Sequence, residues 1–283
     1  TKYPTKGAAL WQPLSLKSLH PLRGIGRRGL FSLFFSLRRP APQACACGHG
    51  AEPTLKERMI CLEHTTAIEL RHITKRFGKV VANDDISLEI RRGEILSLLG
   101  ENGSGKTTLM NMLAGIYFPD EGKILVNGEP TTIASPKDAF ACGIGMIHQH
   151  FKLVDVFSAA ENIVLGLDGE RKLDLKAASA KILEISEKYG FSIDPNKKIY
   201  DMSVSEKQTV EIIKVLYRGA DILILDEPTA VLTPQETDRL FDVMRNMKAD
   251  GKALVIITHK LHEVMDVSDR VAVLRKGRYI GDV

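Results

Sequence analysis

Residues 100–107 read Gly-Glu-Asn-Gly-Ser-Gly-Lys-Thr, and this stretch decides the fold. It matches the pattern G-x-x-x-x-G-K-[ST], in which a glycine-rich loop wraps closely around phosphate groups. Residues 95–99 before it are mostly apolar and predict a short buried strand, whereas residues 108–114 after it predict a helix. A strand, such a loop and a helix in this order predict a site for the phosphates of a nucleoside triphosphate.

Each residue type in this loop suits that chemistry. Glycine lets the backbone approach the phosphates with its N–H groups pointing inward. The ammonium of Lys106 can reach the β- and γ-phosphates, and the hydroxyl of Thr107 can ligate Mg²⁺. The residues expected to contact the nucleotide here are Gly100, Asn102, Gly103, Ser104, Gly105, Lys106, Thr107 and Thr108. A glycine-rich turn that merely precedes a helix is the weaker alternative, because strand, loop, lysine and threonine all fall in register.

A second buried strand ends in two carboxylates. Residues 222–225 are four consecutive apolar residues, as in a central parallel strand, and Asp226 and Glu227 follow them. Ligands of open α/β sheets bind at the carboxyl ends of the strands. We therefore expect Asp226 to hold Mg²⁺ through water and Glu227 to accept a proton from an attacking water. A solvated turn is the weaker alternative, because the apolar run is long and Pro228 follows.

A third segment lies between the loop and the carboxylates. Residues 202–206 read Met-Ser-Val-Ser-Glu, and Ser203 lies 23 positions before Asp226. This segment resembles the signature Leu-Ser-Gly-Gly-Gln of the ABC ATPases, which stands ahead of a helix at a similar distance before the carboxylate strand. Further positions resemble the same family in the same order. Phe77 stands where the family has an adenine-stacking aromatic residue, Gln149 ends a segment like its glutamine loop, residues 230–233 resemble its D-loop, and His259 resembles its switch histidine.

The resemblance implies ATP and Mg²⁺ as cofactors and assigns roles to these residues. The catalytic residues that it implies are Glu227, His259 and Gln149. The metal ligands that it implies are Thr107, Gln149 and Asp226. The nucleotide contacts that it adds to the phosphate loop are Phe77, Ser203 and Ser205.

The departures from the family pattern indicate which branch of the family this sequence resembles. Met202 replaces the signature leucine, and Val204 and Ser205 replace its two glycines. Residues 226–236 read Asp-Glu-Pro-Thr-Ala-Val-Leu-Thr-Pro-Gln-Glu. Both features resemble the N-terminal half of tandem ATPases that power bacterial import of simple sugars and nucleosides, and residues 147–153 are most similar to the nucleoside-import branch. The implied function is ATP binding and hydrolysis that energises such an importer.

Two of these positions also have structural interpretations. Ser205 and Gln208 have capping-box spacing, so Ser205 could simply begin the next helix. In the family, two ATPase domains pair, and each nucleotide lies between the phosphate loop of one domain and the signature of the other. The β-carbon of Ser205 could crowd the γ-phosphate of the nucleotide in this composite site, which leaves the activity of that site open. Phe77 could be a core aromatic at the end of a strand.

The first part of the chain differs from the rest in charge. Residues 1–51 contain eight Lys and Arg residues and no Asp or Glu, so the net charge of +4 comes from this segment. We expect residues 1–66 to be a disordered basic leader, or an artefact of a misplaced start, and residues 1–58 to be dispensable. Its composition also resembles a transit or signal peptide. The basic charge therefore predicts no nucleic-acid partner, and four cysteines without a disulfide framework fit a reducing cytosol.

The remaining residues, 67–283, are predicted to form one ABC ATPase domain with an α/β P-loop NTPase core. Core strands are expected near residues 95–99, 144–147, 222–226, 254–258 and 271–274. An antiparallel β subdomain is expected from segments near 67–74, 87–91 and 123–127. A helical insert is expected at about 152–218, and its clearest helix carries the apolar stripe Leu175, Ala178, Ile182, Ile185 and Tyr189 and stops at Gly190.

The resemblance also implies partners. A second ABC ATPase domain would pair head to tail with this one, and transmembrane permease subunits would place the pair at the cytoplasmic face of the cell membrane. An extracytoplasmic substrate-binding protein would act indirectly. Because the sequence ends at Val283 after one domain, we expect a fragment truncated relative to the tandem relatives.

Two other functions compete with the importer. A soluble ABC ATPase that serves the ribosome or DNA repair would carry long basic or coiled-coil insertions, and this sequence has none. A regulatory half with weak hydrolysis would be expected to lack catalytic residues, but Lys106, Asp226, Glu227 and His259 are all present. The transported substrate is not encoded in this domain.

Overall fold

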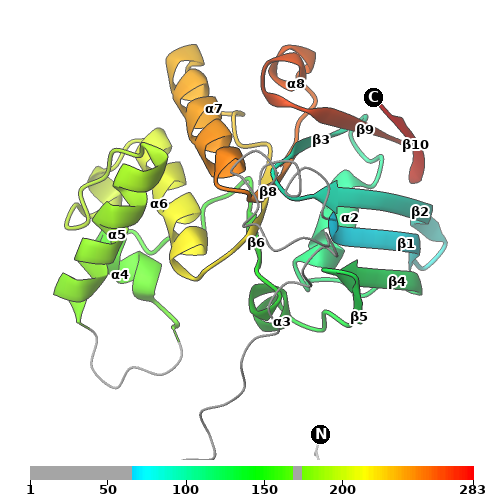
Figure 1. Ribbon diagram of the computed structural model, residues 1–283, viewed down its shortest axis with the longest axis horizontal. Helices are drawn as coiled ribbons and strands as arrows, with labels where there is room; N and C mark the ends of the chain where they lie inside the picture. The colour runs from blue at the N-terminus through cyan, green and yellow to red at the C-terminus, as the bar shows by residue number, and fades with distance from the viewer. Residues whose placement is uncertain (1–65, 168–173) are drawn as a thin grey trace, which may run out of the picture. The chain divides into compact units, whose positions relative to one another are not determined.

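The structure is a computed structural model that describes residues 66–167 and 174–283 (Figure 1). The predictions for the basic leader concern residues outside this described part, and the domain limits of 67 and 283 stay predictions. None of the helices within the described residues is long and apolar enough to cross a membrane.

A six-stranded sheet forms the centre of the fold, in the order β10-β9-β3-β8-β7-β6. The strands are β3 (Ile95–Leu99), β6 (Ile144–Ile147), β7 (Ile222–Asp226), β8 (Ala253–Ile257), β9 (Arg270–Arg275) and β10 (Arg278–Asp282). All but β10 run parallel, and each of the five predicted core strands is present within one residue of its predicted limits. The sequence did not predict β10, because this edge strand is half exposed and lacks an apolar run.

Both faces of the central sheet are covered, which explains its fully apolar strands. Ile222 and Ile224 of β7 belong to a core shared with α2 (Lys106–Leu113) and the second sheet. Leu223 and Leu225 of the same strand belong to a core shared with α7 (Pro234–Ala249) on the opposite face. Alternate residues of one strand thus face different layers, and period-two hydrophobic alternation is absent for this reason.

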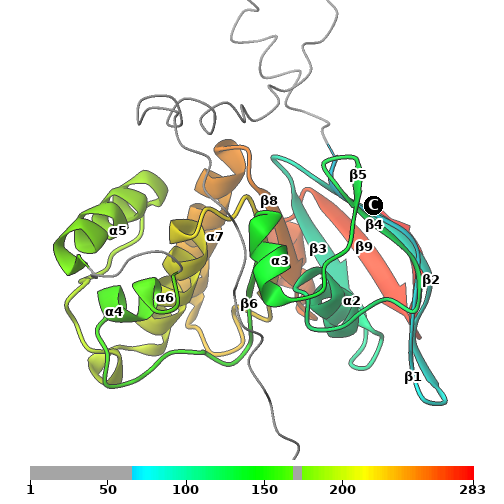
Figure 2. The ribbon, with the colours of Figure 1, turned by 90° about the horizontal axis from the view of Figure 1, so that it is seen from below.

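The second sheet is four-stranded and antiparallel, in the order β2-β1-β4-β5. Its strands are β1 (Thr66–Phe77), β2 (Val80–Arg91), β4 (Glu121–Val126) and β5 (Glu129–Thr131). β2 begins seven residues before the predicted segment, since Asn83, Asp84 and Asp85 disguise its first half and its pairing with β1 is irregular there. Figure 2 shows α2 between this sheet and the central one, where Met112 is buried.

A group of helices lies between β6 and β7 in the sequence. It consists of α4 (Ala159–Val164), α5 (Leu175–Tyr189), a 3₁₀ turn (Ile199–Asp201) and α6 (Val204–Tyr217), which share a small core that includes Ile163, Ile182 and Ile213. α5 ends as predicted at Gly190, which adopts a φ of 84°. The apolar stripe predicted for α5 begins one turn later than expected, because Leu175 is 38% exposed.

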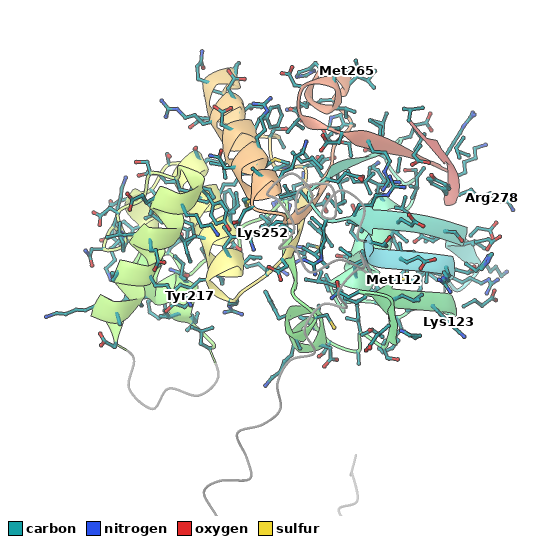
Figure 3. All side chains as sticks on the ribbon, viewed as in Figure 1. Met112, Lys123, Tyr217, Lys252, Met265 and Arg278 are labelled. Carbon is teal, nitrogen blue, oxygen red and sulfur yellow. The ribbon has the colours of Figure 1, made fainter. Side chains whose placement is uncertain are left out.

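The remaining helices are short. α3 (Pro136–Ala141) precedes β6, and α8 (Leu261–Val267) joins β8 to β9. Figure 3 shows Met265 of α8 projecting outward, and this side chain is 85% exposed. In both views the helices α4, α5 and α6 lie on one side of β6, β7 and β8, and α2 lies on the other side (Figures 1 and 2).

Candidate functional site

The glycine-rich loop connects β3 to α2, and its last glycine has no room for a side chain. Gly105 adopts a φ of 95°, and a β-carbon there would lie 2.3 Å from the carbonyl oxygen of Ala82 and 2.6 Å from Nδ2 of Asn83. Asn83 is fully buried, and its Nδ2 donates to the Gly105 carbonyl at 3.1 Å. β2 therefore holds the loop closely from behind, at a position where only glycine avoids both the strain and the clash.

Lys106 folds back over this loop. Its Nζ donates to the carbonyl oxygens of Gly100 at 2.6 Å and Glu101 at 2.9 Å. Burial lowers the pKa of Lys106, whereas the nearby charges of Glu227 and Asp226 act to raise it. The ammonium is therefore held at the loop by dipoles and carboxylates and can exchange them for phosphate oxygens.

Asp226 lies at the carboxyl end of β7 and is only 9% exposed. Burial raises its pKa, the charge of Glu227 raises it further, and a hydrogen bond from Thr107 acts in the opposite direction. The fold thus brings a carboxylate and a hydroxyl together from β7 and α2, and these are the hard oxygen ligands that Mg²⁺ prefers.

Asp226 and Thr107 suit a Mg²⁺ ion whose remaining ligands would come from water and from the phosphates of a nucleotide. Across residues 66–167 and 174–283, no group of three or more His, Cys, Asp or Glu side chains could hold a metal ion by itself. Mg²⁺ commonly keeps several waters and binds one or two carboxylates together with substrate phosphates. Asp226 and Thr107 have the composition of such a site, whereas a site for a structural metal would need more protein ligands.

Glu227 follows Asp226 in a left-handed backbone conformation, with a φ of 47°. Its N–H donates to the carbonyl of Ile257 on β8 at 2.9 Å, which holds this backbone in place. A non-glycine residue in this region costs on the order of 1 kcal/mol or more, so the surrounding structure must enforce it. The conformation directs the side chain toward the ends of the neighbouring strands.

Three residues that the sequence predicts as catalytic meet there. His259 Nδ1 lies 3.2 Å from Oε1 of Glu227, and Nε2 of Gln149 donates to Oε2 of the same carboxylate at a long 3.4 Å. Gln149 follows β6 by two residues, and His259 follows β8 by two residues. Because β6, β7 and β8 are parallel neighbours, their carboxyl ends place the three side chains side by side.

Ser203, not Ser205, begins the helix after the signature. Ser203 is the N-cap of α6 and forms a reciprocal capping box with Glu206. The interpretation that Ser205 and Gln208 form the cap is therefore wrong. Gln208 instead is buried and donates from Nε2 to the carbonyl of Pro228 at 2.8 Å. This bond ties α6 to the segment after the carboxylates.

Ser205 lies half-buried in the first turn of α6. Together with Ser203 it lines a groove of about 640 Å³ that α6 shares with α7. Figures 1 and 2 show β6, β7 and β8 between α6 and α2. One copy of this domain therefore does not bring its signature serines to its own phosphate loop.

Phe77 ends β1 and is 44% exposed, so its ring is not a core aromatic. The ring of Tyr117 meets it edge-on at a centroid distance of 5.2 Å, and Nζ of Lys75 lies 5.4 Å from its centroid. Sequence reasoning missed Tyr117, which follows α2 without a periodic pattern.

A buried network behind the site was also missed. Lys260 donates from Nζ to the carbonyl of Thr229 at 2.9 Å and pairs with Glu263 at 2.9 Å, and Thr258 donates to Glu263 at 3.0 Å. Glu263 is 1% exposed; burial acts to raise its pKa, but hydrogen bonds from Thr229, Lys260 and Thr258 hold the pKa below its usual value. The network fixes the segment around His259 to the segment after Glu227. Its only sequence signal was the i, i+3 spacing of Lys260 and Glu263.

Comparison with known proteins agrees with this geometry. Residues 83–230 match the family described as ABC transporter. The nucleoside import ATP-binding protein NupA of Lactococcus lactis subsp. cremoris is 53% identical over 224 residues, which are 78% of this chain and 44% of NupA. The guanosine import ATP-binding protein NupO of Bacillus subtilis is 53% identical over 215 residues, which are 75% of this chain and 42% of NupO.

A solved structure supports the same assignment. The ADP conformation of MJ1267, an ATP-binding cassette of an ABC transporter, has a TM-score of 0.69 and 25% identity over 77% of this chain and 90% of that chain. The chain therefore belongs to the ABC transporter family and has the fold of its ATP-binding cassettes, which confirms the resemblance and the fold class predicted from the motifs. It spans less than half the length of NupA and NupO.

Proposed function

We propose that this chain is the ATP-binding and ATP-hydrolysing part of a bacterial ABC importer of nucleosides or simple sugars. One observation carries the proposal of hydrolysis: the carboxylate of Glu227 lies between Gln149 and His259 at the ends of three adjacent strands. The names of NupA and NupO support the transported class, since both are import ATP-binding proteins for nucleosides. The cytoplasmic face of the membrane is the corresponding location.

In this proposal the nucleotide binds across the phosphate loop. Lys106 exchanges its two carbonyl partners for β- and γ-phosphate oxygens, and the backbone N–H groups of residues 100–108 bind the remaining oxygens. The exposed ring of Phe77 stacks on adenine. Thr107, Asp226 and Gln149 hold Mg²⁺, which neutralises charge on the phosphates when bound.

Glu227 is the proposed general base. It accepts a proton from water that attacks the γ-phosphate, while Gln149 positions that water and His259 orients the carboxylate and contacts the γ-phosphate. The left-handed backbone at Glu227 keeps the carboxylate in this place before the substrate arrives.

The alternatives have less support. A soluble ABC ATPase outside transport would not share 53% identity with two nucleoside import proteins. A silent regulatory half would not need Gln149 and His259 each in contact with the carboxylate of Glu227. Measurement of radiolabelled guanosine and ribose uptake, in cells with and without the gene, tests the importer assignment, and unchanged uptake of both solutes would remove it.

The metal assignment leads to a prediction about Thr107. Thr107→Val removes a metal ligand and also removes the hydrogen bond that lowers the pKa of Asp226. We expect the Mg²⁺ concentration for half-maximal ATPase activity to rise roughly tenfold. Because the pKa of Asp226 is already raised by burial and would rise further, the defect should grow as the pH is lowered. Titration of Mg²⁺ over a series of pH values measures this, with Thr107→Ser as the control that keeps the hydroxyl; an unchanged Mg²⁺ requirement would contradict the role.

The composite site leads to a prediction about assembly. Ser203 and Ser205 are proposed to contact the nucleotide of a second ABC ATPase domain, because they begin α6, which lies on the other side of β6 and β8 from α2 (Figures 1 and 2). ATP held between two domains stabilises the dimer by mass action. Light scattering of the Glu227→Gln variant should show a monomer without nucleotide and a dimer with ATP, and adding Ser203→Glu should abolish the dimer. A dimer of equal stability without ATP would contradict the composite site.

A further inference from the structure

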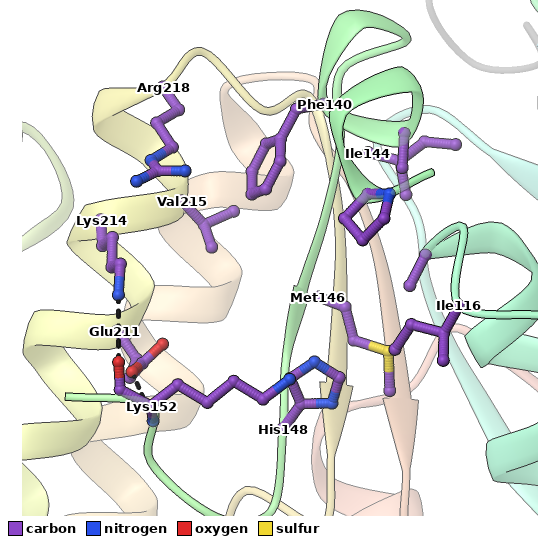
Figure 4. A pocket seen from close by; sticks show the side chains of 13 residues that line it. Ile116, Phe140, Ile144, Met146, His148, Lys152, Glu211, Lys214, Val215 and Arg218 are labelled. Carbon is purple, nitrogen blue, oxygen red and sulfur yellow. Dashed lines mark hydrogen bonds between the residues drawn. The ribbon is translucent and has the colours of Figure 1, made fainter. Parts of the chain in front are cut away.

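The backbone of Lys152 is held at both its polar groups by one helix. Its N–H donates to Oε1 of Glu211 at 2.9 Å, and its carbonyl accepts from Nζ of Lys214 at 3.2 Å. Both side chains come from α6, and their i, i+3 spacing places them on one face. Figure 4 shows the two bonds converging on Lys152.

Burial makes this attachment costly to break. Glu211 is only 8% exposed, and a buried carboxylate without a donor is strongly disfavoured. Burial lowers the pKa of Lys214, and the charge of Glu211 acts against this shift. Both residues line a cavity of about 230 Å³ between α6 and β6, together with His148 and Lys152 (Figure 4). The two charges compensate each other there while each binds the same peptide segment.

The segment held in this way contains Gln149. β6 ends at Ile147, and residues 148–154 form neither helix nor strand. The chain is thus fixed by pairing with β7 on one side of Gln149 and by α6 at Lys152 on the other. The nearest anchors on the two sides of Gln149, at Ile147 and Lys152, lie five residues apart, and Val154 is held further along by Asn162.

We propose that Glu211 and Lys214 are positioning residues, which hold Lys152 on the signature helix α6 and thereby place Gln149 against Glu227 and the metal. This inference rests on the proposed ATPase function. It gives Glu211 and Lys214 a role beyond the stability of α6, because their bonds go to a loop backbone and not to the helix core.

The first test measures the loop itself and needs no turnover. Glu211→Met has a similar length but offers no oxygen, whereas Glu211→Gln keeps an acceptor for the Lys152 N–H. Amide hydrogen exchange of residues 148–153, resolved by mass spectrometry, should accelerate about tenfold in Glu211→Met and change little in Glu211→Gln. Equal exchange in both variants and the native protein would overturn the proposal.

The second test measures catalysis. In Glu211→Met we expect kcat to fall about tenfold and the Mg²⁺ concentration for half-maximal activity to rise, while KM for ATP changes little, because the phosphate loop is untouched. Glu211→Gln should recover most of the activity. A general loss of folded protein would leave the Mg²⁺ requirement unchanged.

A double-mutant cycle shows whether Glu211 acts through Gln149. Gln149→Ala alone removes the side chain that the anchor positions, so adding Glu211→Met should have almost no further effect on kcat. Multiplicative losses would overturn the proposal. If Glu211→Met does not fold, Lys214→Met, which removes the bond to the Lys152 carbonyl and the positive charge that compensates Glu211, replaces it in all three measurements. A native chain without ATPase activity would refute the proposed function, and the exchange measurement would still decide whether the anchor exists.

Discussion

Glu227→Gln should lower ATP turnover by about 100- to 10,000-fold while leaving ATP binding nearly unchanged. The amide has the size of the carboxylate and keeps an oxygen for His259, but it cannot accept a proton from water. Gln also adopts the left-handed backbone at this position no more easily than Glu, so the substitution should not relax the segment. The loss should therefore appear in kcat and not in the affinity for ATP.

Steady-state ATPase kinetics and the equilibrium binding of a fluorescent ATP analogue measure the two quantities separately. Glu184→Gln on the exposed face of α5 is the matched control and should have native kinetics. A Glu227→Gln protein with native turnover would exclude Glu227 as the base.

Lys106→Met should weaken ATP binding by about 100-fold, because an ammonium that contacts two phosphate groups is replaced by an apolar side chain of similar length. The stability of the folded protein without nucleotide should not fall. Burial lowers the pKa of Lys106, which means that the fold disfavours its charged form relative to the unfolded chain. Lys106→Met removes this cost together with the two hydrogen bonds to the loop carbonyls, so the melting temperature without nucleotide should change little.

Isothermal titration with ATP and Mg²⁺, together with thermal unfolding without nucleotide, tests both parts of this prediction. Lys123→Met, on the exposed surface of β4, controls for the loss of one positive charge (Figure 3). A fall in melting temperature that accounts for the lost binding would show that Lys106 is structural.

Each of the three proposed catalytic side chains is placed by a contact that holds its own backbone segment. Glu227, Gln149 and His259 belong to segments that leave three parallel strands, and each segment is fixed by its own contact. Glu227 is fixed by the Ile257 carbonyl, and the segment beyond Gln149 is fixed by α6. The segment of His259 is fixed by the Lys260 and Glu263 network. Substitutions that alter only a side-chain tip therefore report on chemistry, whereas substitutions in the anchors report on geometry.

The sequence alone determined the features that depend on local pattern. The phosphate loop between a strand and a helix, the apolar run ending at Asp226, and the stop of α5 at Gly190 each follow from residues that are neighbours in the chain. Such features need no knowledge of the fold, because glycine conformations, helix caps and buried strands have their own residue preferences. The family followed from several of these patterns occurring in one order.

Only the tertiary structure decided what depends on contacts between distant segments. Two serines at the start of α6 have capping-box spacing in the sequence, Ser203 with Glu206 and Ser205 with Gln208, and in the structure Ser203 is the cap. Gln208 is instead buried and bonds to the carbonyl of Pro228, twenty residues away in the chain, which the local pattern does not indicate. β10 is a strand because it pairs antiparallel with β9 at the edge of the central sheet, although its own residues show no apolar run. Likewise, nothing in the sequence around Glu211 indicates that its carboxylate binds the backbone of Lys152. A hydrogen bond between a side chain and a distant backbone leaves no periodic pattern, and its partner exists only once the chain has folded.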